Sequence, residues 1–353
     1  MNVGIIGAGL QGRRRASVFL AKSESRVEAV ACGHKDDLRS TKQLAEPIGA
    51  KAYPNWEEII ADQNIDAVIV CTPPHLHAEM SIRSLEAGKH VLCEKPLART
   101  VGEAELMVRK ARETGLTLKC GFNHRHHPAV LQAKKWVDAG LLGALDFGRS
   151  RYGICGRVGY EKEWRADPKI VGGGQLMEQG IHALDLFRWF LGEFSEVTAF
   201  VGTRYWNMKP LEDNAFVLLR STDGKVAELH SSLTLWKNAF SLDIFGHEGY
   251  VSIDGLGGSY GTERATLAKR DFEKPFSEEV IEYRGLDPSW RLEWDEFESS
   301  VRDHREPTGS ALDGLQAMRL VNAAYESNRT GCTTRLDIQK NETRGVLGSS
   351  MSV

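Results

Sequence analysis

A lysine, a glutamate and a histidine supply the side chains that oxidation of an alcohol requires. Lys95 lies just beyond an expected strand at residues 90–93, while Glu178, His182 and Asp185 occur at helical spacing and therefore share one face. Oxidation needs a base for the hydroxyl proton while a hydride leaves the same carbon, and the pKa of histidine suits that base. A lysine ammonium group stabilises the developing alkoxide charge. We predict Lys95, Glu178 and His182 as catalytic residues, with His182 as the proton acceptor.

The segment before this helical face contains a run of three glycines at residues 172–174. Such a run lets the backbone approach a bound cofactor closely. We expect Asp185 to orient the imidazole of His182, and Glu178 to bind a substrate hydroxyl. The alternative for His182, taken alone, is a hydrogen-bonded histidine of the core.

A glycine-rich turn lies near the start of the chain. Residues 7–12 read Gly-Ala-Gly-Leu-Gln-Gly directly after the apolar run at residues 3–6, which is the pattern of dinucleotide-binding folds. These glycines permit a tight turn and close approach of a pyrophosphate, and the following helix supplies N–H donors. An ordinary glycine turn is the alternative, but the strand–turn–helix context favours a cofactor. The predicted contacts are Gly7, Gly9, Leu10, Gln11 and Gly12.

The choice between NAD and NADP depends on the residues after the second expected strand. An acidic residue there would hold the ribose hydroxyls of NAD, but His34 and Lys35 occupy that place and would tolerate a 2′-phosphate. We expect both to contact the cofactor, with a slight preference for NADP. In the alternative, Asp36 reaches back and the cofactor is NAD. The arginines at residues 13–15 either contact phosphate or form a solvated basic face.

Strand and helix patterns alternate over residues 1–120, as in a parallel sheet. Buried strands are predicted at residues 3–6, 27–32, 67–71, 90–93 and 116–120, and helices at residues 76–87 and 101–114. Thr100 and Glu103 form a capping-box pair at the start of the second helix. Ligand sites of parallel sheets lie at the carboxyl ends of their strands, so Lys95 should point into a crevice.

The pattern changes near residue 123. Helices are predicted at residues 128–139, 175–191, 289–301 and 312–328, with a strand near 145–152 and four or five alternating strands within 197–253. Consecutive strands without intervening helices indicate a mainly antiparallel sheet. The predicted fold class is α/β. A Rossmann domain at residues 1–122 precedes a C-terminal α+β domain at residues 123–330 and a tail at residues 331–353.

Several motifs resemble the Gfo/Idh/MocA family, named for glucose–fructose oxidoreductase and inositol dehydrogenase. They are Glu94-Lys95-Pro96, Ala-Gly-Lys-His-Val at residues 87–91, Thr-Pro-Pro-His-Leu-His at residues 72–77, Gly-Phe-Asn at residues 121–123, and the helix with Glu178 and His182. The resemblance covers residues 1–330 and implies a C-terminal domain with a large open sheet. Family members use this sheet for oligomer contacts, so a homodimer or homotetramer is expected.

The resemblance also implies residues of the site, with Lys95 and His182 acting at the substrate carbon. The implied dinucleotide contacts are Cys71, Thr72, Pro73, His77, Glu94, Lys95 and Asn123, and the implied substrate contacts are Lys95, Arg125, Trp164, Arg165, Glu178 and His182. A surface loop anchored by tryptophan is the alternative for Trp164 and Arg165. The sequence departs from the family at two places, because Glu178 replaces an aspartate and the acid after the second strand is missing.

Composition argues against several other classes of protein. The formal net charge of the 353 residues is -3, so no basic field favours nucleic acid, and no apolar run approaches the ~18 residues that span a bilayer. The six cysteines form no CxxC pair and are expected to be reduced, in a cytoplasmic protein. His124, His126 and His127 form no recognisable metal-ligand set, and no metal is predicted.

The leading hypothesis is an NAD(P)-dependent dehydrogenase or reductase. It would move a hydride between the nicotinamide and a secondary hydroxyl or ketone of a sugar, sugar derivative or cyclitol, with no nucleic acid or membrane as partner. One alternative is a glycosidase that uses NAD transiently, and another is a non-catalytic dinucleotide-binding regulator. The presence of both Lys95 and His182 argues against the regulator.

Overall fold

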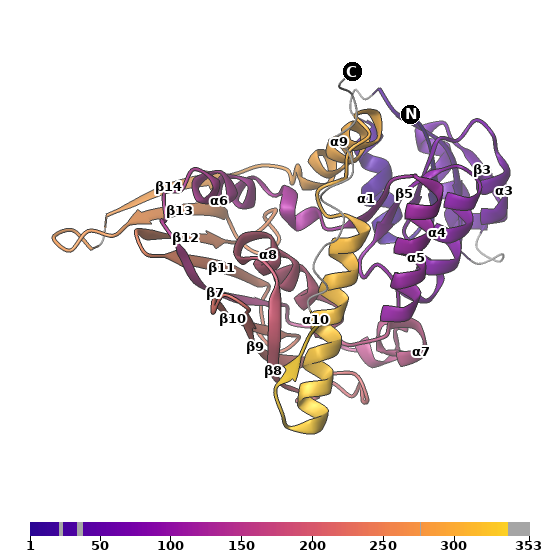
Figure 1. Ribbon diagram of the computed structural model, residues 1–353. Coiled ribbons are helices and arrows are strands. Elements are labelled where there is room, and N and C mark those ends of the chain that lie inside the picture. Colours follow the sequence, from indigo (N-terminus) through magenta and orange to yellow (C-terminus); the bar gives the residue numbers. More distant parts are fainter. Residues whose placement is uncertain (21–23, 34–37, 276, 338–353) are drawn as a thin grey trace, which may run out of the picture.

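The computed structural model describes residues 1–20, 24–33, 38–275 and 277–337 of the chain. They form a six-stranded sheet and a nine-stranded sheet that are joined by helices (Figure 1). The predicted Rossmann sheet followed by a mainly antiparallel sheet is confirmed.

The first sheet is parallel throughout, with the strand order β3-β2-β1-β4-β5-β6. The central strands are apolar because both faces of the sheet are covered, and all four residues of β4 are buried. The order reverses between β1 and β4, where the carboxyl ends of the strands offer a ligand crevice. The strands are β1 (Asn2–Ile6), β2 (Arg26–Ala31), β3 (Lys51–Tyr53), β4 (Ala67–Val70), β5 (His90–Glu94) and β6 (Leu118–Gly121).

The helices of this unit follow its strands along the chain. They are α1 (Leu10–Ser17), α2 (Leu38–Ala45), α3 (Trp56–Ala61), α4 (His77–Glu86) and α5 (Val101–Thr114). Helix α5 begins with the predicted capping box, in which the Thr100 hydroxyl accepts from the Glu103 amide. It ends at Gly115, whose φ of +67° is left-handed and suits glycine.

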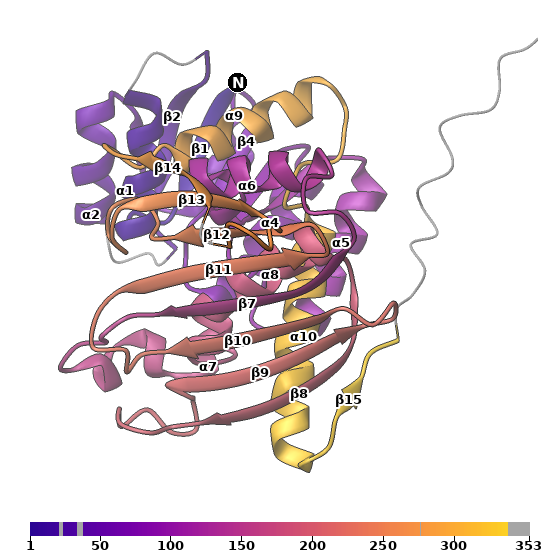
Figure 2. The ribbon, with the colours of Figure 1, turned by 90° about the vertical axis from the view of Figure 1, so that its left-hand side faces the viewer.

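The second sheet has the order β14-β13-β12-β11-β7-β10-β9-β8-β15, in which only the neighbours β7 and β10 are parallel. Helices lie on one face of this sheet, and Figure 2 shows the other face uncovered. Its strands are β7 (Leu145–Gly153), β8 (Phe194–Gly202), β9 (Asn214–Ser221), β10 (Val226–Ser232), β11 (Ala239–Gly246), β12 (Gly249–Asp254), β13 (Glu263–Lys269), β14 (Glu278–Tyr283) and β15 (Thr334–Arg335).

Helices α6 (Pro128–Asp138), α8 (Ile181–Leu191) and α10 (Ala311–Thr330) pack on the covered face. Helix α9 (Ser289–Arg302) instead packs on the first sheet, because Trp294 and Phe297 share a core cluster with Val3. The chain therefore returns to the Rossmann unit after residue 288. The expected division into two domains at residue 122 does not include this return.

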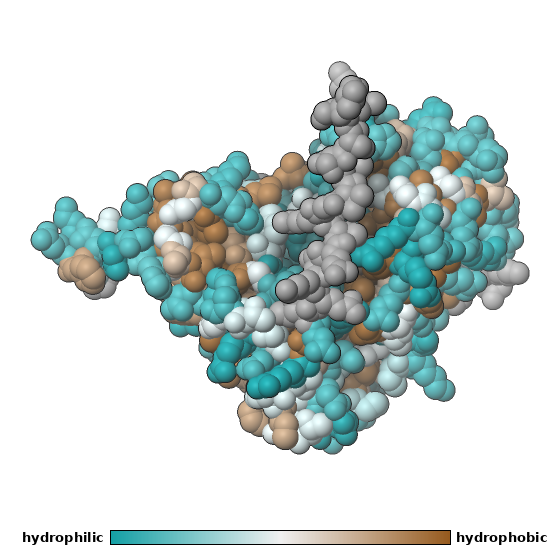
Figure 3. All heavy atoms as spheres, in the orientation of Figure 1, coloured by the Kyte–Doolittle hydropathy of each residue, from teal (hydrophilic) through white to brown (hydrophobic). Residues whose placement is uncertain are grey.

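The described surface is mostly hydrophilic on the side seen in Figure 3, where hydrophobic residues gather near α6 and the edge strands of the second sheet. Within the described part of the chain, no helix has both the length and the apolar character needed to cross a membrane.

Candidate active site

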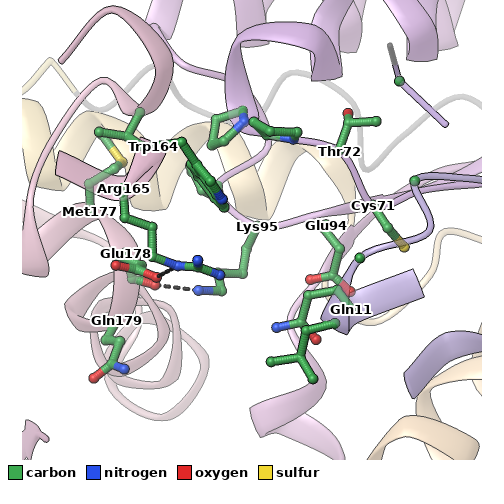
Figure 4. Close-up of a pocket in the computed structure, with 18 of the residues that line it drawn as sticks. Gln11, Cys71, Thr72, Glu94, Lys95, Trp164, Arg165, Met177, Glu178 and Gln179 are labelled. Carbon is green, nitrogen blue, oxygen red and sulfur yellow. Dashed lines mark hydrogen bonds and ion pairs between the residues drawn. The ribbon is translucent and has the colours of Figure 1, made fainter. Parts of the chain in front are cut away.

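A cavity of about 580 Å³ lies between the carboxyl ends of the first sheet and the second unit. Figure 4 shows Glu94 and Lys95 reaching it from one side and Arg165 and Glu178 from the other. The predicted cofactor residues that line it are Gly7, Gly9, Leu10, Gln11, Cys71, Thr72, Pro73, Glu94 and Lys95. The predicted substrate residues that line it are Lys95, Trp164, Arg165 and Glu178. One cavity thus joins most of the predicted cofactor and substrate residues.

The glycine turn after β1 has the shape that a dinucleotide requires. A Cβ on Gly12 would lie 1.8 Å from the carbonyl oxygen of Gly7, so this glycine permits close contact between turn and helix. A Cβ on Gly9 would meet no atom within 4 Å and would extend into open space at the start of α1. That space, beside the free N–H groups of a helix N-terminus, fits a pyrophosphate. The residues present therefore fit a dinucleotide.

Lys95 follows the last residue of β5, Glu94, and its ammonium group donates a hydrogen bond to the carbonyl oxygen of Glu178. Burial lowers the pKa of Lys95, while the carboxylates of Glu178 and Glu94 act in the opposite direction. An ammonium group has three N–H donors. Donors beyond the one bound to Glu178 are available to an oxygen atom of a substrate in the cavity.

Glu178 lies in a π-helical turn, Leu176–Gly180, that precedes α8. One carboxylate oxygen accepts from the Tyr160 hydroxyl at 2.6 Å, and the other accepts from Nε of Arg165 at 2.8 Å. The Arg165 guanidinium also lies over the ring of Trp164, 4.3 Å from its centroid. Trp164 and Arg165 are thus part of the cavity wall rather than a separate surface loop.

His182 lies behind this wall and is 3% exposed. Its ring stacks on the ring of His124 with centroids 3.8 Å apart, and its Nδ1 has no hydrogen-bond partner among the described residues. Burial lowers the pKa of His182 well below its ordinary value, and nearby His124 and Lys95 lower it further. The imidazole is therefore neutral at neutral pH, which a proton acceptor requires.

One expectation about this helix is wrong. Asp185 does not orient His182, because both of its carboxylate oxygens accept from the Arg125 guanidinium, at 2.7 and 2.8 Å. The glycine run also makes close contacts within the protein. A Cβ on Gly172 would lie 2.1 Å from the carbonyl oxygen of Arg99, and only Gly173 of the run lines the cavity.

Other predicted residues lie outside the cavity lining. Arg125 is 4% exposed, because Asp185 and Asp313 surround its guanidinium. His77 contacts the carbonyl oxygens of Thr72 and Pro96 at 2.7 and 2.9 Å, so it connects the segments that follow β4 and β5. Asn123 donates to the Ser289 hydroxyl. These contacts hold the loops that form the cavity. His34 and Lys35 lie outside the described residues.

Arg15, one of the three arginines after the glycine turn, has a role other than the two expected from the sequence, which were phosphate contact and a solvated basic face. Arg15 is 1% exposed and binds Glu94 at 2.7 Å and Glu293 of α9 at 2.5 Å. The guanidinium thus connects the cavity residue Glu94 to the returning helix. Sequence reasoning also missed Arg157 and Tyr160 of the wall, since single residues in an irregular loop leave no periodic signal.

A Rossmann sheet, the glycine turn after β1 and the half-buried Lys95 at one cavity define a dinucleotide-dependent oxidoreductase. Two family models match the chain: the oxidoreductase family with an NAD-binding Rossmann fold over residues 1–122, and the GFO/IDH/MocA C-terminal domain over residues 130–252. The chain therefore belongs to the Gfo/Idh/MocA family of oxidoreductases.

Individual relatives agree with this assignment. A levoglucosan dehydrogenase of Pseudarthrobacter phenanthrenivorans is 32% identical over 219 residues, which are 58% of this chain and 54% of the relative. A myo-inositol 2-dehydrogenase of Thermotoga maritima is 28% identical, over 93% of this chain and 96% of the relative. The solved structure of a levoglucosan dehydrogenase in complex with NADH has a TM-score of 0.86 at 24% identity, covering 96% and 99% of the two chains. This last likeness establishes the fold.

Proposed function

We propose that this protein is an NAD(P)-dependent dehydrogenase or reductase that acts on a secondary hydroxyl or ketone of a sugar, sugar derivative or cyclitol. The observation that carries the proposal is that the glycine turn after β1 and the hydrogen-bonded Lys95–Glu178 pair line one cavity. The named activities of the relatives support the substrate class. Neither the transient-redox glycosidase nor the regulator finds support among them.

We assign a role to each part of the site. The N–H groups at the start of α1 would hold the pyrophosphate, and the bound nicotinamide supplies the acceptor or donor of the hydride. Lys95 would donate to the reacting oxygen and stabilise its charge. Glu178, Trp164 and Arg165 would orient the substrate ring, and His182 would accept the proton after Glu178 and Lys95 rearrange around the substrate.

A substrate screen tests this function. Purified protein is incubated with a panel of aldoses, sugar derivatives and cyclitols, each with NAD and with NADP, while the absorbance of the reduced nicotinamide is followed. Ketose and keto-cyclitol reduction is followed in the reverse direction. Turnover of at least one compound is expected. If no compound is turned over although NADH or NADPH binds, the proposed function is wrong.

We also propose that the protein accepts NADP at least as well as NAD, because His34 and Lys35 occupy the place of the usual acidic residue. The variant His34→Asp should shift the kcat/KM ratio towards NAD, since a carboxylate accepts from the ribose hydroxyls and repels the 2′-phosphate. Kinetics with both cofactors measure the shift. A wild-type protein that rejects NADP would contradict the proposal and favour Asp36 as the ribose ligand.

A further inference from the structure

Glu212 is a buried glutamate that the catalytic residues described above do not include. It lies in the loop before β9 and is 5% exposed. Three consecutive backbone amides donate to this one residue. Gly174 and Leu176 donate to the two carboxylate oxygens at 2.9 Å each, and Gln175 donates to the backbone carbonyl oxygen at 3.0 Å.

These amides form the start of the helix that contains the candidate active-site glutamate. The first amides of a helix have no partner within the helix, and their partial positive charge favours a carboxylate. The Tyr325 hydroxyl of α10 donates to the same carboxylate at 2.8 Å. Glu212 therefore binds the amides at the start of the helix, and Tyr325 of α10 holds the Glu212 carboxylate in place.

The contact between the start of the helix and the Glu212 backbone is close enough to require glycine at position 174. A Cβ on Gly174 would lie 2.1 Å from the carbonyl oxygen of Glu212 and 2.7 Å from its amide nitrogen. Gly174 in turn accepts a hydrogen bond from the amide of Glu178 at 2.8 Å. One turn of backbone thus connects the buried carboxylate to Glu178, and the carbonyl oxygen of Glu178 accepts from Lys95.

We infer that Glu212 is a positioning residue, which sets the place of the π-helical turn and thereby the distance between Glu178, Lys95 and a bound substrate. This inference rests on the proposed function, because it concerns the same site. A displacement of about 1 Å at reacting groups costs on the order of 10²-fold in rate. A small shift of this turn is therefore sufficient to reduce turnover.

The same chain offers a matched control. Glu263 is 3% exposed and accepts from the amides of Ala129 and Gly257, at 2.8 and 2.9 Å, and from His127 at 3.0 Å. It is thus a buried carboxylate with two backbone donors and one side-chain donor, as Glu212 is. Glu263 lies outside the cavity lining, and its hydrogen bonds do not reach the turn that contains Glu178, so its variant reports the cost of losing such a carboxylate away from that turn.

The variants Glu212→Gln and Glu263→Gln are compared in the full-length protein. An amide offers one acceptor oxygen where the carboxylate offers two, so both variants should lose stability. For Glu212→Gln we expect kcat to fall roughly 10–100-fold, with the Kd for NADH or NADPH within about threefold of wild type and KM changed less than kcat. For Glu263→Gln we expect an equal or larger loss of Tm and a kcat close to wild type.

Deuterium uptake of a peptide spanning residues 172–182 gives a readout that needs no turnover. Faster uptake in Glu212→Gln than in Glu263→Gln is expected. Equal uptake, or an equal loss of kcat in both variants, would overturn the inference. If wild-type protein turns over no compound of the screen, the proposed function fails, and the uptake result alone then decides whether Glu212 holds the turn.

Discussion

The carboxylate of Glu178 is engaged on both sides before a substrate arrives. Tyr160 donates to one oxygen and Arg165 to the other. Each oxygen retains a lone pair that could accept from a substrate hydroxyl, so Tyr160 and Arg165 would orient the carboxylate towards the substrate proposed above. Lys95 binds the backbone carbonyl oxygen of Glu178 rather than its carboxylate. The carboxylate therefore has Tyr160 and Arg165 as its partners.

The pH dependence of the reaction tests His182 as the proton acceptor. Burial and the neighbours His124 and Lys95 lower the pKa of His182 well below 6.5. The neutral base is then present at pH 6.5 and is lost only at lower pH, so kcat/KM for oxidation should remain level as the pH falls through 6.5. The variant His182→Asn should lower kcat by about 10²–10⁴-fold and remove the acid limb of the profile.

Steady-state kinetics across the acid range measure both effects. An unchanged profile in His182→Asn would show that His182 is not the base. Lys95, whose pKa burial also lowers, would then have to accept the proton.

The sequence predicted the site where a motif marks it. Gly7 and Lys95 were predicted from a glycine turn and a strand end, and Glu178 from its helical spacing with His182; all three of Gly7, Lys95 and Glu178 line the cavity. Arg125 was assigned to the substrate because it adjoins such a motif, but its carboxylate partners, Asp185 and Asp313, lie 60 and 188 residues away in the sequence. Contacts between residues so far apart in the sequence depend on the fold, so local spacing cannot predict them.

At the scale of elements, strongly patterned segments were predicted well. The predicted helix at residues 101–114 matches α5, and the one at residues 289–301 matches α9 to within one residue. Strand β3 was missed because it has three residues, of which none is buried. The edge strand β14 was missed because it reads Glu-Glu-Val-Ile-Glu-Tyr and is mostly exposed. The helix predicted at residues 175–191 begins with a π-helical turn, which hydrophobic periodicity does not reveal.

The start of this helix yields a prediction at the same scale. In Gly174→Ala the added methyl group would collide with the Glu212 backbone, so the turn must move, at a cost of about 1–3 kcal/mol. Turnover should fall with the displacement of Glu178. A matched control is Gly202→Ala, where a Cβ meets no atom within 4 Å.

Thermal unfolding and kcat are measured for both variants. Gly174→Ala should have the lower Tm and the lower kcat, while Gly202→Ala should resemble the wild type. Equal behaviour of the two variants would show that the contact between Gly174 and Glu212 does not position the site.

At the scale of the whole molecule, one face of the nine-stranded sheet is open (Figure 2). Exposed apolar side chains alternate with buried ones on its outer strands, and Phe200, Phe216 and Leu218 are 72%, 46% and 52% exposed. Monomeric proteins rarely leave such apolar rows in water. We therefore predict a homodimer or homotetramer formed through this face.

Sedimentation equilibrium at micromolar concentration should give a mass two or four times the 39.2 kDa of the chain. The variant Phe216→Glu should shift the mass towards the monomer, because it places a charge in the contact and removes about 2 kcal/mol of apolar burial. Phe272→Glu is the control, since Phe272 is 88% exposed and lies between β13 and β14, outside the sheet. A wild-type mass near 39.2 kDa would contradict the prediction.

We propose that Lys95 serves the chemistry at a cavity whose glycine turn binds the dinucleotide independently of Lys95. The most direct test measures turnover and dinucleotide affinity in Lys95→Ala, with the substrate identified by the screen and with NADH or NADPH fluorescence titration. We predict a loss of kcat of at least about 10²-fold, with a dissociation constant close to that of the wild type. Unchanged turnover would show that Lys95 does not serve the chemistry, and a loss of dinucleotide binding equal to the loss of turnover would show that Lys95 acts by binding the cofactor.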